Sequence, residues 1–228
     1  MKVAALTLWE LRFLAKYQLL AISVFISAMY FGLFVGFGID NNAMVVLAVF
    51  SDPVMMGFMF TGVLILYDKN QRTIKAISVM PLPIHSHLLS RGLALTILAE
   101  LCSMAIAVAA KGLDFNIPLF LVAVAMNSLV FYYIGIICLA GVDTFNNFIM
   151  RVAIMLAPLF LPLLSLIDIM HTPWFYLFPT MASVISFSAA FEPVVYTELA
   201  YAYSFLTLTL FFTKYLAEKT YMRILLCS

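Results

Sequence analysis

The chain has 228 residues, of which 65% are hydrophobic and only 10% are charged, and its formal net charge is +1. A soluble domain carries about 25% charged residues, so the composition excludes a domain whose whole surface faces water. Apolar runs of about 20 residues outnumber segments that alternate like barrel strands. The sequence therefore predicts an all-α polytopic membrane protein, and the dispersed charges indicate no nucleic-acid partner.

Six apolar segments can be drawn as membrane spans. They are residues 19–37, 43–66, 88–110, 118–140, 152–167 and 199–213. With a cytosolic N-terminus, eleven of the twelve Lys and Arg residues fall on the cytosolic side and only Lys111 falls outside. The positive-inside rule expects this bias. The sequence thus predicts a single domain over residues 1–228, with six transmembrane helices and both termini in the cytosol.

Residues 3–17, before the first span, are predicted to form an interfacial helix. Trp9 suits the headgroup level, and Arg12 and Lys16 are i,i+4 neighbours on one face. Glu10 interrupts the apolar stripe of this helix. The alternative is that the segment is only a charged flank of the first span.

The second span contains Asp52 followed by Pro53, a pair typical of a helix N-cap and first turn. The pair predicts that the helix breaks and restarts at this point. At ~1.5 Å per residue, Asp52 would lie about 22 Å from the inner boundary, in the outer part of the hydrocarbon. A structural cap and a contact along the translocation path are both open.

Glu100, in the third span, is the acid that this topology places at mid-membrane. Such carboxylates face a bundle interior, an interface or a watery cavity. Because no basic residue lies at a comparable depth, we expect Glu100 to be protonated or hydrogen-bonded to Asn127 of the fourth span. A structural contact between helices and a place along a translocation path are both open.

The second half of the chain contains two proline-bearing regions. Residues 141–147 are predicted to form a short polar cytosolic turn. In the fifth span that follows, Pro158 and Pro162 each remove a backbone donor and favour a kink. Within an outer segment at 169–196, residues 180–191 are apolar but too short to span, which fits a re-entrant half-helix.

Motifs for catalysis and nucleotide binding are absent from the sequence. It contains no G-x-x-x-x-G-K-[ST] phosphate loop and no G-x-G-x-x-G. His85 and His87 resemble a metal pair, but His171 falls on the opposite side of the predicted membrane, so a polar interfacial loop is the simpler interpretation. The sequence therefore predicts no catalytic residues, no metal site and no cofactor bound by this chain.

The longest polar interval lies between the second and third spans, and residues 71–80 within it are compatible with a short helix. Its apolar face consists of Ile74, Ile77 and Met80. Its basic face consists of Lys69, Arg72 and Lys75. Pro81 and Pro83 then end the helix. Charge alone would indicate a solvated positive-inside loop, but an apolar row in the cytosol needs something to cover it and so predicts a docking surface.

Short motifs along most of the chain resemble those of ABC-2-type permease subunits, most of all the fluoroquinolone-export permease branch. They lie at residues 9–12, 50–53, 67–73, 79–82, 88–91, 145–148 and 178–180. Asp68-Lys69 matches the acid–basic pair that this family shows at the end of the second span. Arg72 stands where the family usually has glycine, Met80 where it has threonine and Arg91 where it has lysine.

The resemblance implies a six-span permease with an elbow helix at 3–17, a cytosolic coupling helix within 67–87 and re-entrant helices before the sixth span. It places Trp9, Glu10 and Arg12 in the elbow helix. The residues that it implies for contact with the ATPase are Asp68, Lys69, Arg72, Thr73, Ile74, Lys75, Ile77, Met80 and Pro81.

Two such permeases, identical or related, would pair with two separate ATPase subunits that bind ATP and Mg. Closure of the ATPases would push through the coupling helix, and a hydrophobic or amphipathic substrate (drug, lipid or peptide) would leave outward. The expected location is the plasma membrane of a prokaryote. The alternative is a secondary transporter that works alone and uses Glu100 in ion coupling. A membrane-embedded enzyme acting on lipid is a third hypothesis, for which the spans lack clustered polar residues.

Overall fold

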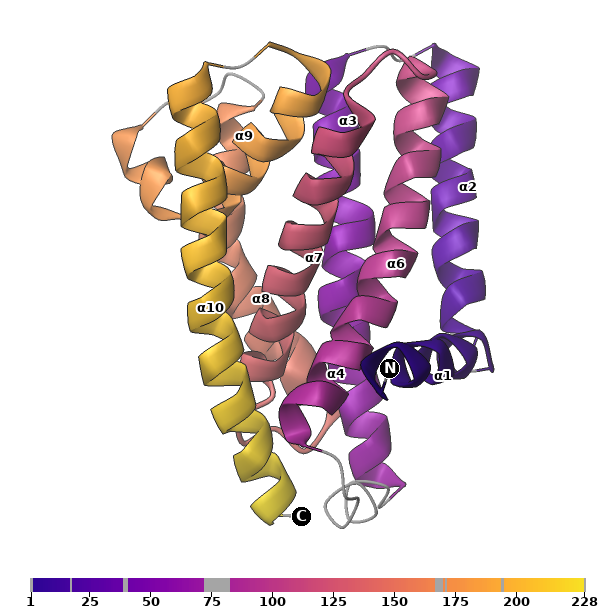
Figure 1. The fold of residues 1–228 in the computed structure, drawn as a ribbon, viewed down its shortest axis with the longest axis vertical. Helices are drawn as coiled ribbons and strands as arrows, with labels where there is room; N and C mark the ends of the chain where they lie inside the picture. The colour runs from indigo at the N-terminus through magenta and orange to yellow at the C-terminus, as the bar shows by residue number, and fades with distance from the viewer. Residues whose placement is uncertain are drawn as a thin grey trace.

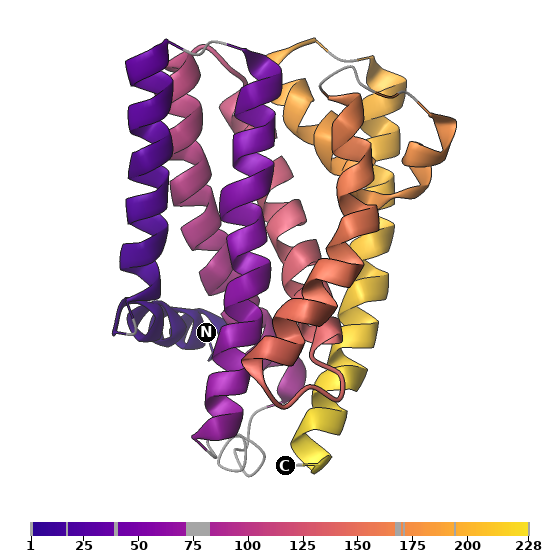
Figure 2. The same ribbon diagram turned by 180° about the vertical axis from the view of Figure 1, so that it is seen from behind.

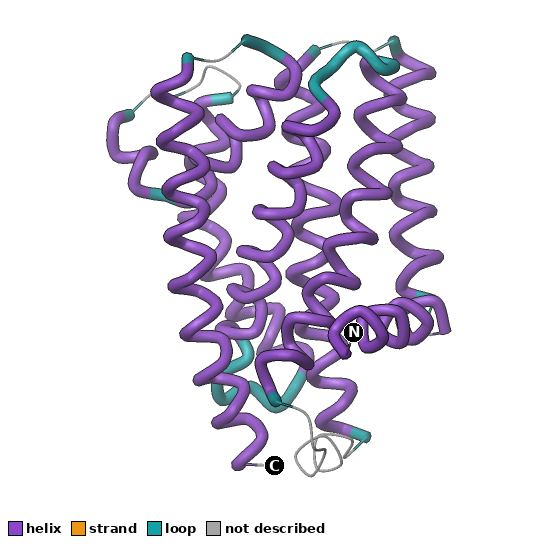
Figure 3. Tube along the Cα trace, in the orientation of Figure 1, coloured by secondary structure: helices purple, strands orange, loops and turns teal. Residues whose placement is uncertain are grey.

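The computed structural model describes residues 2–16, 18–38, 41–71, 83–166, 170, 172–193 and 195–227, and every regular element among them is helical (Figure 3). Within these described ranges, four helices are long and apolar enough to cross a membrane. They are α2 Leu19–Phe37, α6 Ile84–Lys111, α7 Ile117–Cys138, and α8 with its 3₁₀ extension, Phe145–Ser165. The all-α, multi-pass class is confirmed, while the count of six spans and the side of the termini stay predictions.

The second predicted span is one column of three helical segments. They are α3 Asn42–Val49, the π-helix η1 Phe50–Val54 and α4 Met55–Asn70. The column runs the length of the bundle without interruption (Figure 2). The expected break with Asp52 as an N-cap is therefore wrong. Asp52 and Pro53 lie inside the π-helical turn, a local widening in which the missing proline donor is tolerated within a continuing helix.

Helix α8, Phe145–Phe160, begins earlier than expected. The Thr144 side chain caps it by accepting a hydrogen bond from the backbone N–H of Asn147. Asn146 and Asn147 therefore belong to its first turn and not to the predicted polar loop. Near its other end, Pro158 lies within the helix and Pro162 within the 3₁₀ helix η2, Leu161–Ser165. The two prolines thus accompany a tightening of the backbone from α to 3₁₀ geometry.

The C-terminal third contains a short helix and a long one. After the 3₁₀ helix η3, Pro173–Leu177, α9 extends over Pro179–Phe191, nearly the residues expected for a half-helix. α10 is a single helix over Tyr196–Cys227. Its 32 residues span about 48 Å at ~1.5 Å per residue, more than a hydrocarbon core of about 30 Å. It therefore continues well past the predicted end of the sixth span.

Helix α1, Lys2–Lys16, lies across the foot of α2 and α6 (Figure 1). Gln18 connects it to α2 with φ 60° and ψ 7°. This left-handed conformation is uncommon for a residue other than glycine, and it turns the chain sharply from α1 into the bundle.

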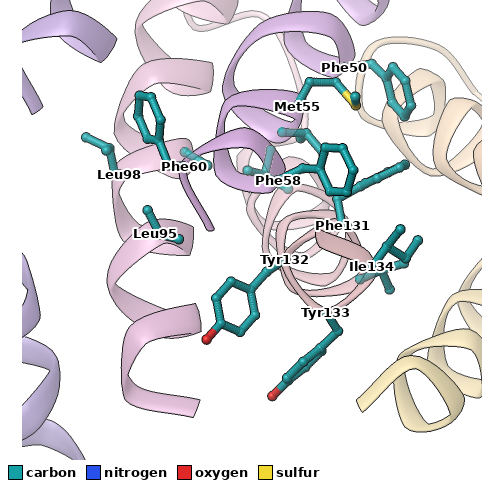
Figure 4. Packing of buried hydrophobic residues seen from close by; sticks show 14 of the residues in the cluster. Phe50, Met55, Phe58, Phe60, Leu95, Leu98, Phe131, Tyr132, Tyr133 and Ile134 are labelled. Carbon is teal, nitrogen blue, oxygen red and sulfur yellow. The ribbon is translucent and has the colours of Figure 1, made fainter. Parts of the chain in front are cut away.

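Helix α7 forms the centre of the bundle, because it packs against α4, α6, α9 and α10. In its lower half, consecutive residues point to different neighbours (Figure 4). Phe131 packs edge-to-face on Phe50, with ring centroids 5.3 Å apart. Tyr132 and Tyr133 are both buried. A helix that is apolar on all sides is typical of the core of a helical bundle.

The crossing of α4 and α7 depends on Gly135. A Cβ added there would lie 2.9 Å from the carbonyl oxygen of Phe58. A backbone carbonyl cannot move aside cheaply, so the two helices can approach this closely only with a small residue at the contact.

We expect Gly135→Ala to lower the free energy of unfolding by about 1–3 kcal/mol, because it overpacks a close helix contact. Gly32→Ala in α2 is the control, since among the described residues no atom lies within 4 Å of the added Cβ. Thermal unfolding of the purified proteins in detergent measures both. Equal stability of the two variants would contradict the packing described for α4 and α7.

Candidate functional site

The region of interest is the foot of the bundle, where α4 ends at Asn70 and α6 begins at Ile84. Residues 72–82, between them, lie outside the described part of the chain. Most of the predicted coupling residues fall there, namely Arg72, Thr73, Ile74, Lys75, Ile77, Met80 and Pro81. Asp68 and Lys69 lie in the last turn of α4 and are described, so the structure shows how both ends of this loop are anchored.

Arg91 anchors the beginning of α6 to two other helices. Its Nη1 donates to Oδ2 of Asp68 on α4 at 2.7 Å, and its Nε donates to Oε2 of Glu10 on α1 at 3.3 Å. Arg91 is only 3% exposed, Asp68 4% and Glu10 1%. A buried guanidinium that bonds two buried carboxylates is held in one position, because any displacement leaves a desolvated charge unpaired.

Other polar side chains complete this cluster. His87, one turn before Arg91, has its Nδ1 3.8 Å from Oε1 of Glu10. The His87 ring lies 6.3 Å from that of Tyr221, a buried residue of α10. From α7, the Tyr132 hydroxyl donates to the carbonyl oxygen of Leu88 at 2.9 Å. We define the buried charge cluster as Glu10, Asp68, His87, Arg91, Tyr132 and Tyr221. It joins five helices at one end of the bundle.

Helix α6 carries a glycine beside this cluster. A Cβ at Gly92 would lie 2.9 Å from the ring of Tyr132. The absence of a side chain at Gly92 thus leaves the space in which Tyr132 reaches the carbonyl oxygen of Leu88.

The cluster contains two carboxyl groups for one guanidinium, because Arg91 bonds both Asp68 and Glu10. Burial raises the pKa of the Glu10 carboxyl above its ordinary value of 4.5, although the neighbouring Arg91 acts in the opposite direction. Burial also raises the pKa of the Tyr221 hydroxyl to about 12, so it stays protonated. The carboxyl group of Glu10 therefore takes up a proton at a higher pH than an exposed glutamate does.

A second, exposed contact ties α4 to the loop before α8. Lys69 forms an ion pair with Asp143, and this contact lowers the pKa of the Asp143 carboxyl. From α8, Arg151 donates to the carbonyl oxygens of Ala140 and Cys138 at the end of α7. The foot of α4 is thus connected to α1 and α6 on one side and to the α7–α8 loop on the other.

The intramembrane polar residues predicted from the sequence are not brought together. Glu100 lies partly buried on α6. The Asn127 amide donates to the Ala123 carbonyl at 2.8 Å and to Oγ of Ser186 on α9 at 3.2 Å. Its Oδ1 has no hydrogen-bond partner among the described residues, so the expected bond to Glu100 is not formed. Asn127 instead joins α7 to α9.

Sequence reasoning noticed four members of the cluster, namely Glu10, Asp68, His87 and Arg91, but assigned them to separate motifs. Glu10 was treated as an interruption of an apolar stripe, whereas Thr7, Glu10 and Leu14 are the buried face of α1. Their i, i+3 and i+7 spacing was the available signal. His87, Tyr132 and Tyr221 were missed as site residues, because single polar residues in apolar helices give no sign of which partners they meet.

His85 and His87 occupy the first turn of α6 and not the polar loop expected from the sequence. Within the described part of the chain, no group of three or more His, Cys, Asp or Glu side chains could hold a metal ion. His87 belongs instead to the charge cluster.

Comparison with known proteins identifies the family. The family model described as the fluoroquinolones export permease protein family matches residues 1–227. The chain belongs to this family. Fluoroquinolones export permease proteins of two Mycobacterium tuberculosis strains, CDC 1551 / Oshkosh and ATCC 25618 / H37Rv, are each 27% identical to it over 147 residues. The match covers 63% of this chain and 61% of each relative, so the chain spans less than two thirds of their length.

We expect Asp68→Asn to lower the free energy of unfolding by up to about 3–5 kcal/mol, because it leaves Arg91 buried with one weaker partner. Glu10→Gln should cost less than Asp68→Asn, since burial raises the pKa of Glu10 and so favours the neutral form that Gln resembles.

The raised pKa of Glu10 also predicts how the free energy of unfolding depends on pH. A carboxyl with a raised pKa contributes stability that is present below its ordinary pKa and is lost as the pH rises through the raised value. The wild type should therefore lose stability relative to Glu10→Gln as the pH rises from about 4 to 8. Thermal unfolding of both proteins over this range measures the difference. A wild type that gains stability relative to Glu10→Gln with rising pH would refute the assignment.

Proposed function

We propose that the chain is the membrane-spanning permease subunit of an ATP-binding cassette exporter in the plasma membrane of a prokaryote. In this proposal α2, the column α3–η1–α4, α6, α7, α8 and α10 are the six spans, and both termini lie in the cytosol. The family membership and the multi-pass helical fold support the transport role. The buried charge cluster is the observation that supports coupling to a partner at the foot of the bundle.

The cluster is suited to transmit a displacement of the loop at 72–82 to the bundle. Asp68 lies a few residues before this loop and Arg91 two turns into the helix after it, and their ion pair joins the two ends. A push on the loop would thus move α4 and α6 together, and Glu10 would carry α1 with them. A movement shared by packed helices is how small shifts at one site become a change between two states.

ATP hydrolysis would take place on a separate ATPase subunit with its own Mg, because the sequence holds no phosphate loop. Two permeases, either identical or related, would complete the transporter. The relatives are named for the export of fluoroquinolones. On that basis we infer a hydrophobic or amphipathic substrate for this chain, with drugs ahead of lipids and peptides, moved outward between the permeases.

The proposed docking surface is tested by Ile74→Asp and Ile77→Asp, with Ile77→Leu as the apolar control. An acid on the apolar face of the loop should leave membrane insertion intact but prevent co-purification of the ATPase, because its carboxylate would have to be desolvated in the interface. Co-purification from membranes, with every subunit identified, measures assembly. Undiminished assembly of both Asp variants would refute this docking surface.

Transport in vesicles with collapsed ion gradients separates this proposal from a secondary transporter that uses Glu100. An exporter driven by ATP hydrolysis should transport under these conditions only when ATP is present. Transport that needs an ion gradient and no ATP would support the rival function instead.

A further inference from the structure

A groove lies between α2 and α6 above the elbow helix α1. It has a volume of about 340 Å³, and its walls run from Leu20 to Phe31 on α2 and from Leu98 to Ala105 on α6. Both walls belong to candidate membrane spans. The residues that line the groove are almost all apolar, so inside a bilayer its natural occupant is a hydrocarbon chain.

The dimensions of the groove fit one leaflet. The wall on α2 begins at Leu20, directly after the turn at Gln18 that leaves α1. From there to Phe31 the helix rises about 16 Å. One leaflet contributes about half of a hydrocarbon core of roughly 30 Å. A groove that starts at the interface and ends near mid-membrane therefore matches the extent of one acyl chain.

Basic residues lie on the helix that precedes the wall of the groove on α2. Helix α1 lies at the foot of α2 (Figure 1), and its Arg12 and Lys16 side chains are exposed. Trp9 is 57% exposed on the same helix, as suits a residue at headgroup level. Glu10 is the acid of α1, and it is buried against Arg91. The exposed charged side chains of α1 are thus both basic, and Lys16 lies shortly before Leu20, where the wall of the groove on α2 begins.

We propose that the groove binds one anionic phospholipid, with an acyl chain between α2 and α6 and the phosphate group at Arg12 and Lys16. Burial of the chain adds little affinity, because the surrounding bilayer is equally apolar. Selectivity for the lipid therefore comes from the basic headgroup site, while the groove fixes its position. The bound lipid would fill the space beside α2, a helix whose surface is mostly exposed.

The experiment measures lipid retained by the purified full chain in detergent. Phosphatidylglycerol and phosphatidylcholine with identical acyl chains are added, and bound lipid is counted by native mass spectrometry. We expect one phosphatidylglycerol per chain and no matching retention of phosphatidylcholine. Arg12→Gln should weaken phosphatidylglycerol binding about fivefold, the effect of one basic residue near an anionic headgroup. Its control is Arg223→Gln, which removes an exposed charge from α10, away from the groove.

A second variant tests the groove itself. Ala105→Phe places a ring in the groove and should abolish retention of phosphatidylglycerol, whereas Ala153→Phe makes the same change on the exposed side of α8 and should not. Equal retention of the two lipids, or unchanged retention in Ala105→Phe, would overturn the proposal. A change of oligomeric state in Ala105→Phe without lipid loss would also overturn it, because a second copy of the chain would then be the occupant.

Discussion

The structure at the foot of the bundle depends on the burial of Arg91. Removing a guanidinium from water costs several kcal/mol, so the fold must supply partners at fixed positions. Asp68 and Glu10 meet this requirement from two different helices, each with almost no exposure of its own. The charge therefore determines where α1 lies and how the end of α4 is placed against the beginning of α6.

Two kinds of contact hold the bundle together, one in its middle and one at its foot. Towards the middle, α7 packs closely with its neighbours through apolar side chains and small residues such as Gly135. At the foot, charged and phenolic side chains join the helices through a few directional bonds. A buried ion pair resists small displacements of one helix relative to another, because a displacement would leave a desolvated charge unpaired. The foot of the bundle is thus the place where a displacement is shared among helices.

The class of the fold could be predicted from the sequence, because long apolar runs and the distribution of basic residues depend on local composition. The contacts between side chains of different helices could not be predicted. Asp52 was expected to break a helix because Asp-Pro is typical of an N-cap and first turn, but a π-helical turn accommodates it. Asn127 was matched to Glu100 by depth alone, and rotation about the helix axis turns it to α9 instead. The contact between Glu10 and Arg91 could be predicted only by knowing where α1 lies against α6, and hydrophobic periodicity does not give this position.

The central claim is that Arg91 transmits movement between the loop at 72–82 and the bundle. The most direct test uses the proposed complex with an ATPase and compares substrate exported per ATP hydrolysed for the wild type, Arg91→Gln and the exposed control Arg223→Gln. Folded Arg91→Gln transporter should still bind its ATPase and hydrolyse ATP, but export far less substrate for each ATP. Arg223→Gln should match the wild type. An unchanged ratio of export to hydrolysis in Arg91→Gln would contradict the claim.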